Sequence, residues 1–232
     1  MTAFLVLACL CVAGLLAAVL FAAVTFALTP FARVFASKVV VGFGPRLLSR
    51  RVRGTEIELR LVPFLSSVDL VGANPFATPE EIARASVEMP AGRLRWTEAP
   101  RWRRVVAFVV APRAVVVALP VLFLGPARTF HHVVSGIGEI FAGAVSPFDT
   151  ARRILVAAAF VVTSEGVPTL VALCLCKMTS FAILGLPADL PFAMVRAPNQ
   201  TVAKLRAVWM LVWFVPYAAW IVAWVAWALR GG

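Results

Sequence analysis

The segment from Ala3 to Leu28 contains no charged residue, and this feature constrains the fold most strongly. As an α-helix, its 26 residues would exceed the ~30 Å thickness of a bilayer's hydrocarbon core, because each residue adds about 1.5 Å. The segment also lacks the basic start and the short apolar core that mark a signal peptide. We therefore expect a transmembrane helix over residues 3–28.

Three further apolar segments are long enough to span a membrane, at 105–124, 167–186 and 208–229. The first is interrupted by Pro112 and Arg113, and the second carries Lys177. A shorter apolar run at 154–163 is expected to lie at the interface or to pack within the bundle. With 62% hydrophobic and 14% charged residues, the chain is predicted to be an α-helical polytopic membrane protein, with residues 1–232 as a single membrane domain.

The distribution of basic residues predicts the orientation. Residues 30–104 contain 13 Lys/Arg and 7 Asp/Glu, and the loop 187–206 is also basic. The positive-inside rule places both segments in the cytoplasm and both termini outside, and we expect a bacterial inner (plasma) membrane location. We interpret the net charge of +11 as a sign of membrane topology and of contact with anionic lipid. Nucleic-acid binding would need a soluble basic domain, and no segment is long enough for one.

The stretch that follows the first apolar segment alternates like a β-strand. In "TEIELRLV", Ile57, Leu59 and Leu61 alternate with charged residues, and "KVVVGFGPRLL" is a suitable partner strand across the polar turn "SRRVRG". We expect a membrane-associated β-hairpin over about 38–64 and a short helix starting at Pro79. The segment 128–144 has the spacing of an amphipathic helix, expected on the outer side.

The order of these segments resembles the site-2-type intramembrane zinc metalloproteases. "GFGPRLLSRRVRGTEIELRLVPF" is similar to the family's β-region, "PRWRRVVAFVVAPRAV" to the start of its second helix, "IGEIFAGAVSP" to its G-x-L-x-x-G-x-V-S segment, and "SFAILGLPADLP" to its F-N-L-L-P-I-P-x-L-D-G motif. There is no room for a PDZ domain. The resemblance implies a hairpin that steers an extended substrate by strand addition.

The chain departs from that family at the residues that hold zinc. "FAAVT" stands where the family has H-E-x-x-H, which supplies two zinc ligands and a general base. His131 and His132 are expected to be solvated residues of the outer loop. The resemblance to the family, together with these departures, implies that the chain has no metal and no catalytic residue. The positions at which the family's metal-site residues are replaced or displaced, called degenerate here, are Phe21, Ala22, Thr25, Val115, Ala182 and, one residue short of the family spacing, Asp189.

Two basic residues lie inside predicted spans, where a bare cation is costly. Arg113 and Lys177 must therefore face protein, water or an acidic group, and the candidate anions are Asp189 and Glu165. We expect Arg113 to pair with Asp189, with Glu165 as the alternative. Two interpretations stay open, a fixed charge with a function or an ion pair that locks the bundle.

The last span carries a tryptophan stripe. Trp213, Trp220 and Trp224 fall on one face, which is expected to contact lipid or a partner helix. The four cysteines lie in apolar runs and are expected to be buried and reduced.

The favoured function is that of a non-catalytic, intramembrane-protease-like protein. It would bind or scaffold a transmembrane or strand segment of a membrane-protein partner, through Ile57, Leu59 and Leu61 of the hairpin and through the three tryptophans. One alternative is an active protease with an unrecognised zinc site. Another is a small anion-binding transporter or a membrane-complex subunit. No cofactor is expected.

Overall fold

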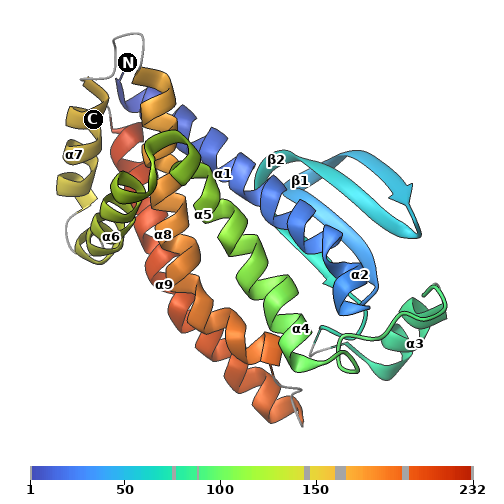
Figure 1. Ribbon diagram of the computed structural model, residues 1–232. Coiled ribbons are helices and arrows are strands. Elements are labelled where there is room, and N and C mark those ends of the chain that lie inside the picture. Colours follow the sequence, from blue (N-terminus) through green and yellow to red (C-terminus); the bar gives the residue numbers. More distant parts are fainter. Residues whose placement is uncertain are drawn as a thin grey trace. The chain divides into compact units, whose positions relative to one another are not determined.

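The computed structural model describes residues 2–74, 77–87, 89–143, 147–159, 166–194 and 199–230 (Figure 1). Four helical segments are long and apolar enough to cross a membrane, namely Phe4–Ala27, Arg101–Leu124, Gly166–Leu190 and Gln200–Leu229. They correspond to the four segments predicted from the sequence. The predicted class, a helical protein with four candidate spans and a β-hairpin, is confirmed at this level.

The chain divides into two compact units. The first contains Met1–Ala17, Val116–Leu186 and Met210–Gly232, and the second contains Ala18–Val115 and Pro187–Trp209. The long helices α1 (Thr2–Ala27), α5 (Ala111–Leu124), α8 (Gly166–Met194) and α9 (Gln200–Leu229) each contribute residues to both units. That the units form a single membrane domain stays a prediction.

The core of the first unit is apolar and rich in aromatic side chains. Besides the long helices, the first unit includes α6 (Pro126–Gly143) and α7 (Pro147–Ala159). Trp220 and Trp224 are only 3% exposed and lie in this core, where Trp220 packs edge-on against Phe181. The expectation that these two tryptophans contact lipid or a partner was wrong, because they fill the interior of their own bundle. Trp213 is half-buried. The core residues are Val6, Cys9, Ala13, Ala151, Leu170, Cys174, Leu175, Trp220 and Trp224.

Helices α6 and α8 pack closely at a glycine. A Cβ atom on Gly136 would lie 2.5 Å from Ser180 Oγ. That hydroxyl is fully buried and is within hydrogen-bonding distance of two carbonyl oxygens, 3.0 Å from Val133 O and 2.8 Å from Cys176 O. A larger residue at position 136 would therefore have to displace the hydroxyl or separate the helices.

The second unit is built around the hairpin. After α1, the short helix α2 (Thr29–Ala32) leads into β1 (Ala36–Val52), which pairs with β2 (Thr55–Leu70). Thr55 Oγ1 donates to the carbonyl of Ala36 at 2.7 Å and so ties the start of β2 to the start of β1. Figure 1 shows that both strands curl strongly. The strands extend beyond the predicted 38–64 at both ends.

The segment between the hairpin and the next span is held by local hydrogen bonds. Helix α3 (Pro79–Val87) begins with a capping box, in which Thr78 N donates to Glu81 Oε2 and Glu81 N donates to Thr78 Oγ1. Trp96 N then donates to Val71 O at 2.8 Å, which attaches the loop to the end of β2. The span that follows consists of α4 (Arg101–Val105), the π-helical turn η1 (Val106–Val110) and α5.

The contact at Gly136 generates a prediction. Gly136→Ala should lower the free energy of unfolding by about 1–3 kcal/mol, because the methyl group has no space beside Ser180. Gly138→Ala is the matched control, since a Cβ atom there meets nothing within 4 Å, and alanine is the better helix former. Thermal unfolding in detergent should separate the two variants. Equal stabilities would show that the α6–α8 contact is looser than described.

Candidate functional site

Arg113 lies in an irregular part of its helix. In the π turn η1 the backbone N–H of Ala111 donates to Val106 O, and Pro112, which follows, has no N–H to donate. Such π turns often accompany functional sites. Arg113 itself is only 9% exposed. Its Nη1 donates to Val109 O at 2.9 Å, one turn earlier on the same helix.

The second nitrogen of the Arg113 guanidinium group meets an acidic residue. Nη2 donates to Asp189 Oδ2 in an ion pair. The sequence predicted this pair, and the structure contains it. Helix α8 continues through Pro187 to Met194, so Asp189 remains on the helix and its side chain reaches α5. The Asp189 side chain is 41% exposed, and solvent therefore screens part of the attraction between the two charges.

An aromatic ring covers the same guanidinium group. The Arg113 Cζ atom lies 5.9 Å from the centroid of the Phe21 ring, within the range of a cation–π contact. Phe21, Arg113 and Asp189 all belong to the second unit. The structure thus brings together α1, α5 and α8 at one cation.

The other positions that the resemblance singled out lie in different surroundings. Ala22 and Thr25 are buried one turn or less from Phe21, and Thr25 Oγ1 has no hydrogen-bond partner among the described residues. Val115 is half-buried, two residues after Arg113. Ala182 belongs to the first unit, and Glu165 lies outside the described residues.

The side chains at these positions cannot replace the zinc-binding histidines. A phenyl ring and a methyl group offer zinc no lone pair, and a neutral threonine hydroxyl is a poor ligand. Within the described ranges, no three His, Cys, Asp or Glu residues come together as a group that could hold a metal ion. What the site does hold is a fixed, paired positive charge.

Lys177 has a different partner from those expected. Its Nζ atom pairs with Glu139 Oε2 on α6, and both side chains are mostly buried, with exposures of 10% and 14%. The expected anions, Asp189 and Glu165, are thus replaced by Glu139. Glu139 is the sole acidic residue of segment 126–143, and that fact could have identified it as the partner.

His131 and His132 lie on α6, and this helix confirms the amphipathic helix predicted over 128–144. His131 is exposed, whereas His132 is half-buried. Burial lowers the pKa of His132, and the nearby His131 and Lys177 lower it further.

The hairpin register changes the interpretation of its edge. Residues Glu56–Leu59 each have two partners, one in Lys38–Val41 and one in Leu48–Arg51. Leu59, for example, is paired with both Val41 and Leu48. The strand addition expected at Ile57 and Leu59 therefore has no free side in this register, because the hairpin curls back and covers both sides of this segment.

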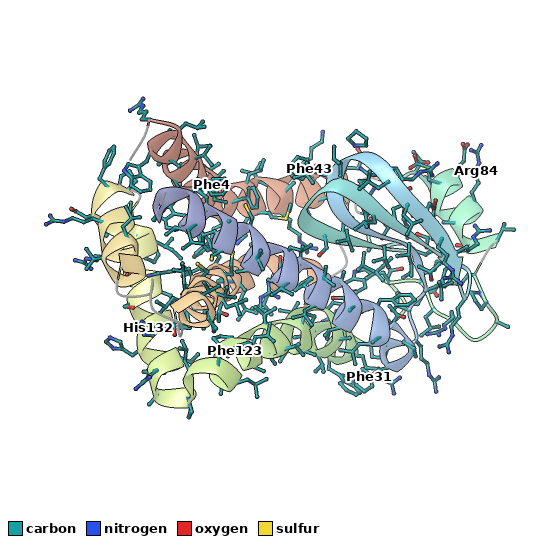
Figure 2. The ribbon with its side chains drawn as sticks, turned by 90° about the horizontal axis from the view of Figure 1, so that it is seen from above. Phe4, Phe31, Phe43, Arg84, Phe123 and His132 are labelled. Atoms are coloured by element: carbon teal, nitrogen blue, oxygen red, sulfur yellow. The ribbon has the colours of Figure 1, made fainter. Side chains whose placement is uncertain are left out.

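The open edge lies in the second half of β1. Arg46 and Leu48–Val52 have one partner each, all in β2, and the side chains of residues 43–51 are exposed. This segment, Arg46–Val52, is called the β1 edge below. Ser66–Leu70 also pairs on one side only, with the start of β1. Phe43, at the bend that precedes the β1 edge, projects from the hairpin in Figure 2.

Charges on the hairpin are compensated around Glu58. Its side chain is 5% exposed and forms ion pairs with Lys38 Nζ at 2.8 Å and with Arg60 Nη2 at 3.0 Å. The hydrogen bond from Lys38 is the main reason that the pKa of Glu58 is lowered. Arg46, at the start of the β1 edge, also contributes, because its Nη1 lies 3.7 Å from an oxygen of Glu58 and 3.7 Å from an oxygen of Glu56.

The comparisons with known proteins add no relative. No family model matches the sequence, and no curated protein or solved structure matches it significantly.

The Arg113–Asp189 pair can be tested by a double-mutant cycle. Arg113→Leu and Asp189→Leu should each lower the free energy of unfolding by about 1–3 kcal/mol, less than for a fully buried pair because Asp189 is partly exposed. The double variant should lose less than the sum of the two single losses. Reversible unfolding in detergent measures all four proteins. Strict additivity would contradict an energetic coupling between these side chains.

Proposed function

We propose that this protein is a non-catalytic relative of the site-2-type intramembrane proteases that binds a segment of a membrane-protein partner. One observation carries the proposal. Phe21, Arg113 and Asp189, which lie at or beside positions that the family uses for its metal site, meet at one point. They are far apart in the sequence and lie on three different helices, so their meeting supports the relationship that the sequence resemblance implies.

In this proposal the arginine replaces the metal as the central cation. A zinc ion and an arginine both supply positive charge to an inward aspartate, but arginine adds a planar set of donors and no Lewis acidity. The pair would keep α5 and α8 in place without supporting hydrolysis. The structural role of the site is retained and its chemistry is lost.

The binding surface in this proposal is the β1 edge. Its backbone groups face no other described strand on one side, so an extended segment of a partner can add there as a further strand. Exposed Leu47 and Leu48 give such a segment apolar contacts.

The proposed orientation follows from charge. The hairpin and the segment 187–206, which was expected to be a loop but includes the end of α8 and the start of α9, lie in the cytoplasm in this proposal. Both termini lie outside, because basic residues concentrate in these two segments. We place the protein in a bacterial inner (plasma) membrane. The partner segment would then approach from the cytoplasmic end of its own transmembrane helix.

The alternative of an anion transporter has less support. Such a protein needs a cation that is free to meet its substrate, but Arg113 and Lys177 are both ion-paired with carboxylates of the same chain.

The loss of zinc chemistry gives a direct test. The purified protein should contain far less than one zinc per chain by elemental analysis and should not cleave a model transmembrane substrate. Introducing the motif with Phe21→His, Ala22→Glu and Thr25→His should raise the zinc content, because the two histidines add zinc ligands to the Asp189 carboxylate. Stoichiometric zinc in the unmodified protein, or cleavage that a chelator stops, would overturn the proposal.

Strand addition is tested by proline at consecutive positions of the β1 edge. Because N–H groups alternate in direction along a strand, either Leu48→Pro or Ser49→Pro removes an outward donor. That variant should abolish partner crosslinking from a photoreactive residue at Leu61, while alanine at either position should have little effect. Proline at Leu59, by contrast, would remove a ladder hydrogen bond inside the sheet, because this segment is paired on both sides, and should unfold the hairpin.

Limited proteolysis checks that the hairpin stays folded in each variant. Crosslinking that survives both proline variants, or that is lost equally with alanine, would show that the partner does not bind as an added strand.

A further inference from the structure

Arg104 is a buried cation without an ion-pair partner in the part of the chain that the structure describes. It is only 3% exposed, and its Nε and Nη1 atoms are buried without a hydrogen-bond partner among the described residues. A charged group removed from water in this way is strongly unfavourable unless something compensates it.

Contact with an aromatic ring compensates this charge only in part. The Arg104 Cζ atom lies 5.3 Å from the centroid of the Trp96 ring, and Trp96 packs edge-on against Phe108. A cation–π contact acts through the face of the guanidinium group, however. The N–H donors point outward in the plane of that group, and the ring does not satisfy them.

Two neighbouring arginines strengthen the need for an anion. Arg101, Arg103 and Arg104 fall within four positions, and none forms an ion pair with a described residue. Arg103 lies over the rings of Phe31 and Trp102, and its Nε atom is also buried without a hydrogen-bond partner. The positive charges of Arg101 and Arg104, three residues apart on α4, repel one another, and a bound anion would relieve that repulsion.

The position of the cluster indicates which anion it meets. The candidate span Arg101–Leu124 begins at this cluster, so the guanidinium groups stand where the helix enters the bilayer. Trp96 and Trp102 are side chains typical of that depth. Lipid phosphates lie at the same level, and arginine binds phosphate oxygens in a bidentate manner.

We propose that Arg104, together with Arg101 and Arg103, forms a binding site for the phosphate group of an anionic membrane lipid. The phosphate oxygens accept hydrogen bonds from the unpaired N–H groups of Arg104, while Arg101 and Arg103 add positive charge that attracts the phosphate. Because the orphaned donors are covered in this structure, the surrounding side chains must shift when the lipid enters. The bound lipid should therefore exchange slowly and survive mild purification.

The test measures lipid binding to the full-length protein in a non-ionic detergent. After delipidation, native mass spectrometry follows the titration with dioctanoyl phosphatidylglycerol, dioctanoyl phosphatidylcholine or inorganic phosphate. The unmodified protein should bind one phosphatidylglycerol at least tenfold more tightly than phosphatidylcholine, and millimolar inorganic phosphate should not displace it.

Variants connect that binding to the cluster. Arg104→Gln should weaken phosphatidylglycerol binding at least tenfold, and Arg104→Lys, which keeps the charge but loses the planar donors, should weaken it severalfold. Arg84→Gln is the matched control, because it removes the same charge from an exposed position on α3 (Figure 2), and it should bind normally. If Arg104→Gln fails to fold, Arg104→Lys and the double variant Arg101→Gln/Arg103→Gln decide the question.

Three results would overturn the proposal. The first is equal binding by the Arg104 variants and the control. The second is equal affinity for the anionic and the zwitterionic lipid. The third is displacement by inorganic phosphate, which would assign the site to the free ion.

Discussion

A charge inside a bilayer must be compensated, and this constraint organises both units of the protein. Arg113 and Lys177 lie within candidate spans, and each is held by a carboxylate from another helix. The hydrophobic effect brings apolar helices out of water, but it does not decide which faces meet once lipid surrounds them. The pairs Arg113–Asp189 and Lys177–Glu139 favour those faces, because an arrangement that separates either pair loses the compensation of two opposite charges.

Close packing supports the polar pairs. Gly136 and Ser180 lie one helical turn from Glu139 and Lys177, so the approach that the glycine permits also brings the two charges together. In the second unit the π turn before Pro112 places Arg113 where it reaches the carbonyl of Val109, Asp189 and the ring of Phe21. A local irregularity of the backbone thus positions the side chain on which our functional proposal depends.

Much of this fold could be predicted from the sequence, since long uncharged segments and period-two alternation are local signals. The four candidate spans and the hairpin belong to this class. The pairing of Arg113 with Asp189 was also anticipated, because a buried cation must have an anion and few were available. Three features depend on tertiary structure and were missed: Glu139 as the partner of Lys177, the burial of Trp220 and Trp224, and the curl that places Leu59 inside the sheet. Periodicity identifies the faces of an element, but it does not say which neighbour covers each face.

The central claim of our proposal is that a paired arginine occupies the place that the metal site has in the site-2-type proteases. A high-resolution electron cryo-microscopy map of the full-length protein in lipid nanodiscs, prepared with zinc present, tests that claim most directly. The account predicts density that joins the Arg113 guanidinium group to the Asp189 carboxylate, with the Phe21 ring beside it. An ion bound to Asp189, or an Arg113 side chain that extends away from Asp189 into the headgroup region, would contradict the account.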